Sequence, residues 1–172
     1  MKIALKKELT GSILDIGGGG EGIIGRLYGS RVTAIDNRQE ELDEAPDTCT
    51  KLCMDATALA FADESFDAVT AFYSLLFMTA REQERAIAEG IRVLRPGGRL
   101  CLWDCAVESA YPDPFVTELD VDLKGELLHT SYGICKLDAQ SRESILSFCL
   151  TKGLTLLISR QEGIHFYLEL QK

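Results

Sequence analysis

Four consecutive glycines occupy positions 17–20, directly after the short apolar run "ILDI", and Gly22 follows after one glutamate. Gly17, Gly19 and Gly22 keep the G-x-G-x-x-G spacing, in which glycines let the backbone pass close to a bound ligand. A helix that begins after such a turn also offers free N–H groups to the ligand. The spacing therefore predicts a nucleotide-type site, and a tight strand-to-helix turn without a ligand is the alternative.

Asp36 lies nineteen residues after Gly17, at the end of the next apolar run. At that spacing an acidic side chain can accept hydrogen bonds from both ribose hydroxyls of a bound nucleoside, although an aspartate also starts ordinary turns. The glycine turn and Asp36 together indicate an adenosine-containing ligand. They do not distinguish a dinucleotide from another adenosine compound, because both use this arrangement.

Short apolar runs alternate with helical periodicity around these residues, which is typical of a mostly parallel sheet covered by helices. The pattern predicts strands at residues 12–16, 31–36, 50–54, 66–77, 99–104, 154–159 and 164–170. It predicts helices at residues 21–29, 37–45, 80–98 and 139–153, with Pro96 stopping the third and Asp138 capping the fourth. The long apolar run at 66–77 should form a buried central strand, and the last two runs a hairpin.

The composition fits a single domain that spans residues 1–172, because a chain of this length with 46% hydrophobic residues can form one core of ordinary size. Lysines and arginines number 18 against 27 acidic residues and are scattered, so the formal charge of −9 argues against a nucleic-acid partner. No apolar run approaches about eighteen residues, and the first residues lack the pattern of a secretory signal. We therefore expect a cytoplasmic protein without a membrane partner.

Six cysteines stand at positions 49, 53, 101, 105, 135 and 149, and no C-x-x-C motif occurs among them. The two C-x-x-x-C pairs lie in apolar, strand-like runs. Because a free cysteine packs as a small hydrophobic residue, we expect reduced thiols in or near the core and no metal site.

Three stretches resemble class I S-adenosylmethionine-dependent methyltransferases, in the branch related to ubiquinone biosynthesis. "LDIGGGG" is similar to the D-x-G-x-G motif of that family, and "MDATALAFADESFDAV" resembles its adenine-binding acidic segment. "IRVLRPGGRLCLWD" resembles the passage from a helix into the fifth strand. The resemblance covers residues 12–104, with one departure: Glu21 stands where many members carry a third glycine or another small residue.

The resemblance implies a Rossmann-like, doubly wound α/β fold with a mostly parallel seven-stranded sheet, an antiparallel last strand and the strand order 3-2-1-4-5-7-6. It also implies S-adenosyl-L-methionine (S-adenosylmethionine) as the cofactor. The cofactor-binding residues that it implies are Asp15, Ile16, Gly17, Gly18, Gly19, Asp36, Asn37, Asp55, Ala56, Phe72 and Tyr73.

Individual roles follow from the resemblance. Asp15 would hold the ammonium group of the cofactor and would repel a pyrophosphate, which favours S-adenosylmethionine over NAD. Asp36 would bind the ribose hydroxyls, whereas Asp55 and Ala56 would bind the adenine ring. Tyr73 would help to line the cleft where the methyl group is presented. The alternatives are that Asp36 and Asp55 are simple capping residues and that Tyr73 is a packing residue.

The implied chemistry is an in-line displacement at a sulfonium methyl group, for which an enzyme mainly supplies proximity, orientation and exclusion of water. A base is needed only where the acceptor must lose a proton. The candidates for that base are Tyr73, Asp104, His129 and Tyr132, because the ligand crevice of such sheets lies at the carboxyl ends of the strands. A histidine such as His129 is also a common surface or packing residue.

Residues 106–137 are too many for a structureless connection in a compact domain. Acidic residues alternate there with Leu119, Val121 and Leu123, so the pattern predicts an antiparallel hairpin with its acidic face in water. Lys124 and Gly125 would form its turn. The family often inserts substrate-recognition segments at this point, so we expect a cover for the acceptor site, with the arm of a homodimer as an equal alternative.

The expected function is methyl transfer to a small-molecule acceptor. The Asn/Asp-Pro-Pro-aromatic signature of enzymes that methylate amino nitrogens in nucleic acids or proteins is absent after the fourth strand, where the chain reads "AFYS". Two alternatives remain. One is a non-catalytic S-adenosylmethionine-binding protein, and the other is a nicotinamide-dependent reductase, which Asp15 and the lack of room for a separate catalytic domain disfavour.

Overall fold

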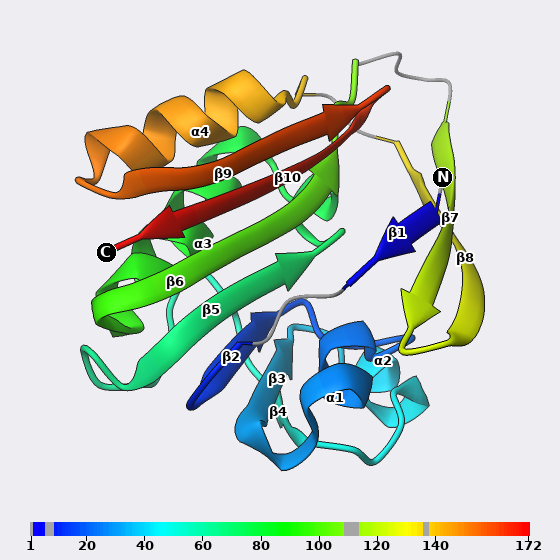
Figure 1. The fold of residues 1–172 in the computed structure, drawn as a ribbon, viewed down its shortest axis with the longest axis horizontal. Helices are drawn as coiled ribbons and strands as arrows, with labels where there is room; N and C mark the ends of the chain where they lie inside the picture. Colours follow the sequence, from blue (N-terminus) through cyan, green and yellow to red (C-terminus); the bar gives the residue numbers. More distant parts are fainter. Residues whose placement is uncertain (1, 6–8, 109–113, 136–137) are drawn as a thin grey trace.

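The computed structural model describes residues 2–5, 9–108, 114–135 and 138–172. Seven strands form its main sheet, in the order β4-β3-β2-β5-β6-β10-β9 (Figure 1). They are β2 (Ile13–Ile16), β3 (Val32–Asp36), β4 (Thr50–Cys53), β5 (Phe66–Phe72), β6 (Leu94–Cys105), β9 (Thr155–Glu162) and β10 (His165–Gln171). The pairs from β4 to β6 are parallel and β10 is antiparallel to both neighbours, which confirms the predicted order and the antiparallel last strand.

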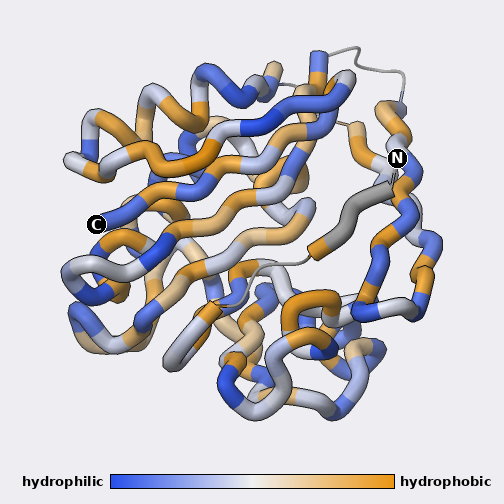
Figure 2. Tube along the Cα trace, viewed as in Figure 1, coloured by the Kyte–Doolittle hydropathy of each residue, from blue (hydrophilic) through white to orange (hydrophobic). Residues whose placement is uncertain are grey.

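Helices cover both faces of the main sheet, as a doubly wound α/β fold requires. They are α1 (Ile23–Tyr28), α2 (Gln39–Glu44), α3 (Ala80–Val93) and α4 (Arg142–Thr151), with the short 3-10 helices η1 (Gly29–Arg31) and η2 (Leu75–Phe77). On one face α3 and α4 pack against β5, β6 and β10, and on the other α1 packs against β3 and β5 (Figure 1). Apolar residues concentrate in the central strands (Figure 2), and their side chains belong to two clusters of buried residues.

The sequence around α3 explains where this helix begins and ends. The Thr79 side chain accepts from the N–H of Glu82, and the Glu82 carboxylate accepts from the N–H of Thr79, which together form a capping box. The helix ends at Val93, earlier than predicted, because backbone before Pro96 favours the extended conformation. Consequently β6 begins at Leu94 instead of residue 99.

Two further boundaries differ from the prediction. The fourth strand of the main sheet is shorter than the predicted 66–77, because Tyr73 takes a left-handed backbone conformation with a φ of 48°. Ser141 caps α4 in place of Asp138. The carboxylate of Asp138 instead accepts from the N–H of Ala80 at 3.1 Å, so it stabilises the start of α3.

A second, three-stranded sheet stands beside the main one (Figure 1). In it β1 (Lys2–Ala4) pairs in parallel with β7 (Phe115–Leu123), and β7 pairs antiparallel with β8 (Glu126–Ile134). The prediction lacks β1. This strand is three residues long and pairs with residues 120–122, so no local pattern marks it.

The hairpin of β7 and β8 confirms the predicted turn. Lys124 and Gly125 have φ angles of 56° and 102°, the positive values that a tight two-residue hairpin turn requires. The apolar residues expected inside are buried: Leu119, Val121 and Leu123. The acidic residues between them are exposed or half-exposed: Glu118, Asp120 and Asp122. Of the segment 106–137, residues 109–113 and 136–137 lie outside the described part of the chain.

The cysteines divide between core and surface. The buried ones are Cys101, Cys105 and Cys149, and Cys49 is half-buried, as predicted. Cys53 and Cys135 are exposed, contrary to prediction, because they lie at the end of an edge strand and just after β8. Among the described residues, no three His, Cys, Asp or Glu side chains cluster so as to hold a metal ion. No helix in this described part has the length and apolar character that crossing a bilayer requires.

Candidate active-site cleft

The glycine turn packs tightly against its neighbours. The N–H groups of its first two glycines donate to the carbonyl of Ile35 at 2.8 and 3.0 Å. A Cβ atom at Gly17 would lie 2.3 Å from the Cβ of Ser74, and one at Gly19 would lie 2.5 Å from the Cβ of Glu41. The turn therefore requires glycines for its own packing, in addition to any space that a ligand needs.

A cleft of about 710 Å³ opens at this turn, at the carboxyl ends of the parallel strands. Its size is typical of small-molecule sites, and its position is that of ligands in open α/β sheets. The predicted cofactor residues that line it are Asp15, Gly17, Gly18, Gly19, Asp36, Asn37, Asp55, Ala56, Phe72 and Tyr73. Ile16 does not belong to this lining; it is buried, and its carbonyl accepts from the Ser74 hydroxyl at 2.8 Å.

Asp15 lines the cleft although only 2% of its surface is exposed. The Thr70 hydroxyl donates to its Oδ1 at 2.7 Å. A Cβ atom at Gly18 would lie 2.6 Å from its Oδ2, so this glycine lets the turn approach the carboxylate. Burial raises the pKa of Asp15 to about 7; the Thr70 bond opposes the rise, and the charge of Asp36 adds to it. A cation bound beside Asp15 would favour its ionised form.

Asp36 ends β3, Asp55 follows β4, and both line the cleft. The Oδ1 of Asp36 accepts from the N–H of Arg38 at 3.0 Å, and the Oδ1 of Asp55 accepts from the N–H of Thr57 at 2.8 Å. These are turn-stabilising bonds of the kind that aspartates commonly form. Each carboxylate therefore stabilises its own loop and also lies on the cleft.

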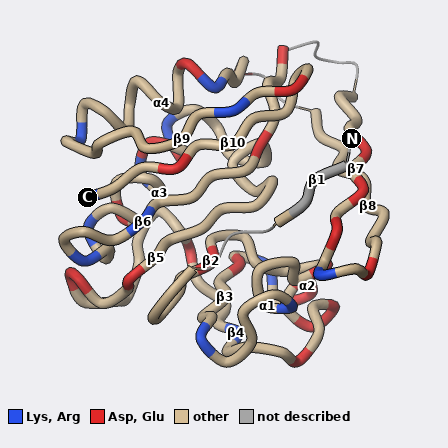
Figure 3. Tube along the Cα trace, viewed as in Figure 1, with Lys and Arg blue, Asp and Glu red and all other residues tan. Residues whose placement is uncertain are grey.

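The cleft is strongly acidic. The charged residues in its lining are Asp15, Glu21, Asp36, Glu41, Glu44, Asp55, Glu82 and one base, Arg38. Figure 3 shows acidic residues along the hairpin and around α2, with lysines and arginines scattered singly over the molecule. A lining of this charge attracts a cationic ligand and repels phosphates.

Aromatic side chains line another part of the cleft. Phe72 and Tyr73 come from the end of β5, Phe77 from η2 and Tyr132 from β8. The Tyr73 and Tyr132 rings are stacked, with centroids 5.3 Å apart and planes 8° from parallel. Phe77 meets Tyr132 edge-on at 6.3 Å and is 57% exposed. Burial raises the pKa of both tyrosines, so their phenols stay protonated near neutral pH.

The hairpin forms one wall of the cleft through residues 131–133. The hydroxyl of Thr130 donates to the carboxylate of Glu21, within the glycine turn. At the tip of the hairpin, the Nζ of Lys124 donates to the carbonyl of Leu27 in α1 at 3.1 Å. Glu21, the one departure from the family pattern, is thus the contact between the turn and the hairpin.

Two of the predicted base candidates, His129 and Asp104, lie outside the lining of the cleft. The alternation of β8 turns His129 outward, where its side chain is 65% exposed and its Nδ1 lies 2.9 Å from the Oδ1 of Asp120. Asp104 is fully buried, and it accepts from the N–H of Leu76 at 3.2 Å and from the side-chain amide of Gln140 at 2.7 Å. The carboxylate of Asp104 therefore positions η2. The other two candidates, both tyrosines, line the cleft.

Several lining residues fall outside the family motifs and were not predicted. They include Arg38, Glu41, Glu44, Phe77, Met78, Glu82, Ser131 and Gly133. A signal for Phe77 was present, because the capping pair Thr79 and Glu82 fixes the start of α3. The residues just before that start must lie in the loop at the carboxyl end of β5, which is where ligands bind.

The chain is similar to known proteins along the part that carries the cleft. Residues 14–102, more than half of the chain, match the family model described as a methyltransferase domain. The chain is 37% identical over 101 residues to the ubiquinone/menaquinone biosynthesis C-methyltransferase UbiE of Paracoccus denitrificans, a match that covers 51% of this chain and 40% of that protein. It is 33% identical over 138 residues to the 27-O-demethylrifamycin SV methyltransferase of Amycolatopsis mediterranei, covering 73% and 49%. The chain spans less than half the length of these relatives.

The fold is also found in a solved structure. The glycopeptide N-methyltransferase MtfA complexed with (S)-adenosyl-L-methionine superposes with a TM-score of 0.63 at 15% identity, covering 96% of this chain and 89% of that one. At such an identity the likeness shows the fold alone, which is the Rossmann-like, doubly wound arrangement predicted from the sequence.

Proposed function

Because the chain belongs to the family of methyltransferase domains, which use S-adenosylmethionine, we propose that it transfers the methyl group of this cofactor to a small-molecule acceptor. The observation that carries the proposal is the acidic cleft at the glycine turn, with the buried carboxylate of Asp15 in its lining. S-adenosylmethionine carries positive sulfonium and ammonium groups, so its charge complements this lining. The pyrophosphate of NAD would be repelled.

The order of residues along the cleft suggests how the cofactor is held. Asp15 faces the ammonium group, whose charge would offset the cost of ionising a carboxyl that burial holds at a pKa of about 7. Asp36, with Asn37 beside it, accepts from the ribose hydroxyls. Asp55 accepts from the adenine amino group, and the N–H of Ala56 donates to the ring. The glycine turn lies against the methionine and ribose portions.

The bound cofactor supplies an electrophilic methyl group on sulfur. The chain's own contribution is to hold the acceptor in line with that group and to exclude water. Phe72, Tyr73 and Tyr132 border the region in which the acceptor would lie, and the exposed ring of Phe77 stands beside them. These rings favour an organic acceptor with an apolar surface, and the acidic lining disfavours an anionic one.

We propose that the segment 106–137 covers the acceptor side of the cleft, within a single domain of residues 1–172. Two observations support a cover over a dimer arm: residues 131–133 line the cleft, and Thr130 binds Glu21 of the glycine turn. A hairpin that served dimerisation alone would need neither contact. Analytical ultracentrifugation of the full chain distinguishes the cover from the dimer arm. A dimer that is lost when the hairpin surface is mutated would favour the dimer arm.

Isothermal titration calorimetry tests the cofactor. S-adenosylmethionine and S-adenosylhomocysteine should bind saturably and raise the melting temperature, as any ligand of the native state does, and NAD should not bind. Transfer is then measured with a methyl-labelled cofactor and a panel of hydroxyl, amine, thiol and carbon acceptors. Cofactor binding without transfer to any of them would favour a non-catalytic binding protein. Saturable binding of NAD alone would overturn the proposal.

A further inference from the structure

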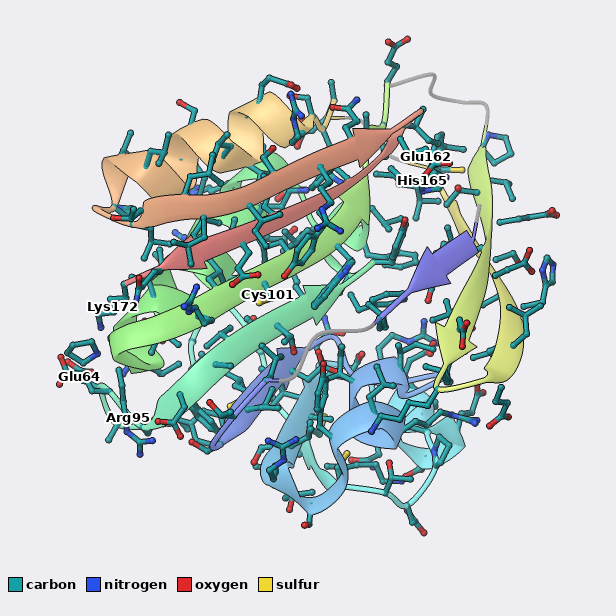
Figure 4. The ribbon with its side chains drawn as sticks, in the orientation of Figure 1. Glu64, Arg95, Cys101, Glu162, His165 and Lys172 are labelled. Atoms are coloured by element: carbon teal, nitrogen blue, oxygen red, sulfur yellow. The ribbon has the colours of Figure 1, made fainter. Side chains whose placement is uncertain are left out.

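The phenol of Tyr73 is paired with His165, the first residue of β10. The Oη of Tyr73 lies 2.7 Å from the Nδ1 of His165, and the ring centroids are 5.9 Å apart. His165 pairs with Glu162 of β9, and Figure 4 shows these two residues together at the end of the main sheet that lies nearest the hairpin. In the described chain His165 is not part of the cleft lining, so it reaches the site only through Tyr73.

The backbone holds Tyr73 in an unusual conformation between the cleft and His165. Its φ of 48° is uncommon for a residue with a Cβ atom, and strain of this kind concentrates at functional sites. The N–H of Tyr73 donates to the carbonyl of Trp103 at 2.8 Å, which fixes the residue to β6. One face of its ring stacks on Tyr132, which also lines the cleft. The conformation thus places Tyr73, a residue of the cleft lining with 1% of its surface exposed, against a histidine.

We infer that Tyr73 and His165 form a proton-accepting pair for an acceptor that carries a hydroxyl group, an inference that rests on the proposed methyl transfer. The O–H bond of the acceptor breaks and its proton moves to the Oη of Tyr73, while the phenol proton of Tyr73 moves to the Nδ1 of His165. The acceptor oxygen forms a bond to the methyl carbon as the C–S bond breaks, and sulfur keeps the electron pair. The positive charge of the sulfonium is replaced by that of the imidazolium.

The protonation states of the two residues suit this transfer. Burial raises the pKa of Tyr73, so the side chain remains a neutral phenol that can donate. Burial lowers the pKa of His165, so its imidazole is neutral near neutral pH and its Nδ1 can accept when the proton is on Nε2. Other titratable groups near the pair are Tyr132, Asp104, Cys105 and Glu162.

The acidic lining explains why the pair points to a neutral hydroxyl and not to a carboxylate. A carboxylate acceptor is already ionised and would be repelled by the lining of the cleft. A neutral hydroxyl enters without that cost, but it must lose its proton as the methyl group is transferred, and the pair receives this proton. His165 acts through Tyr73 and is therefore a positioning residue.

A chromophoric phenol tests the pair without knowledge of the natural acceptor. Protein saturated with S-adenosylhomocysteine is titrated with para-nitrophenol, whose absorbance reports its ionisation, and with para-nitroanisole, which has no proton to give. The bound phenol should ionise at a pH lower by about one unit in the wild type than in His165→Gln or Tyr73→Phe, because a charge-assisted bond is lost. His129→Gln, the matched change at the other histidine, should behave as the wild type.

Identical ionisation of the bound phenol in the wild type and His165→Gln would overturn the pair, and so would equal affinity for the anisole. Failure of S-adenosylhomocysteine to bind the wild type would overturn the proposed function and this inference with it. In His165→Gln, cofactor affinity within roughly twofold of the wild type shows that the fold survives, because His165 lies outside the cleft lining.

Nitrogen-15 spectra of the imidazoles keep the inference testable if His165→Gln does not fold. The chain holds 2 histidines, so His129→Gln assigns both. His165 should be neutral near neutral pH, with its proton on Nε2, and its titration midpoint should rise in Tyr73→Phe. A proton on Nδ1 in the wild type, or an unchanged midpoint in the variant, would contradict the pair.

Discussion

The proposed cofactor side and the proposed acceptor side of the cleft are built differently. The cofactor side consists of the first residues after three neighbouring parallel strands, fixed by backbone hydrogen bonds and close glycine packing, and it carries most of the acidic charge. The acceptor side brings together η2, β8 and the residue after β5, which meet through ring contacts and single polar bonds. The difference predicts that substitutions on the cofactor side reduce cofactor affinity. Substitutions on the acceptor side should instead reduce methyl transfer and leave the cofactor bound.

Gly17→Ala should have the largest effect. The new Cβ would lie 2.3 Å from the Cβ of Ser74 on a backbone with a φ of 71°. Overpacking and left-handed strain together should cost about 2–5 kcal/mol of unfolding free energy and abolish saturable cofactor binding. Gly125→Ala is the control, since its φ is also positive, at 102°, but no atom lies within 4 Å of the new Cβ. Urea unfolding measures both, and equal losses would contradict the packing argument.

The pKa of Asp15 should appear in the pH dependence of stability. Its pKa is about 7 in the folded protein against 3.8 ordinarily, so between these values the folded state holds a proton that the unfolded state has lost. The free energy of unfolding should therefore fall as pH rises through this range, by about 4 kcal/mol in all, and level off above it. Asp15→Asn should lack this component. Urea titrations between about pH 5 and pH 8 give the difference, and parallel curves for the two proteins would rule the shift out.

Asp36→Ala should weaken the binding of the cofactor without unfolding the protein. The loss of two hydrogen bonds to a charged acceptor should cost about 2–4 kcal/mol of affinity, or roughly 30- to 1000-fold. Asp43→Ala is the matched control, because Asp43 lies on the neighbouring α2 and bonds Gln39 outside the cleft. Calorimetry with S-adenosylhomocysteine measures both affinities. An unchanged affinity in a folded Asp36→Ala protein would place the ribose elsewhere.

Thr130→Val should have the smallest effect, and on the acceptor side alone. It removes the hydroxyl that donates to Glu21, at a cost of about 1 kcal/mol to the docking of the hairpin. Hydrogen exchange of the β8 amides should become faster, while cofactor affinity changes by less than roughly threefold. Thr117→Val makes the same side-chain change on the neighbouring strand, at the position that pairs with Tyr132. A large loss of cofactor affinity in Thr130→Val would contradict the claim that the acceptor side can be changed without loss of cofactor binding.

The cofactor side was predictable because its signals are local. Four apolar runs, the glycine turn and the acidic residues after the strands appear in sequence order, and parallel strands bring their carboxyl ends to one edge of the sheet. The hairpin was predictable for the same reason, since alternation and a Lys-Gly turn specify it locally. Ten of the eleven predicted cofactor residues accordingly line the cleft, and Ile16 does not because the strand alternation turns it inward.

The acceptor side was less predictable because its contacts join distant residues. The outward position of the candidate His129, by contrast, follows from the hairpin itself, because the turn at Lys124 and Gly125 pairs it with Asp120. The pairing of Tyr73 with His165 depends on the left-handed backbone of Tyr73 just after β5, which no local pattern marks. The parallel pairing of β1 with β7 is likewise set by tertiary contacts.

A crystal structure of this chain with S-adenosylhomocysteine bound tests the central claim most directly. We predict the ribose hydroxyls within hydrogen-bonding distance of Asp36, the ammonium group at Asp15 and the sulfur directed toward Tyr73 and Tyr132. A ligand that lies outside this cleft, or one that occupies it with its adenine ring at Asp15, would contradict the account.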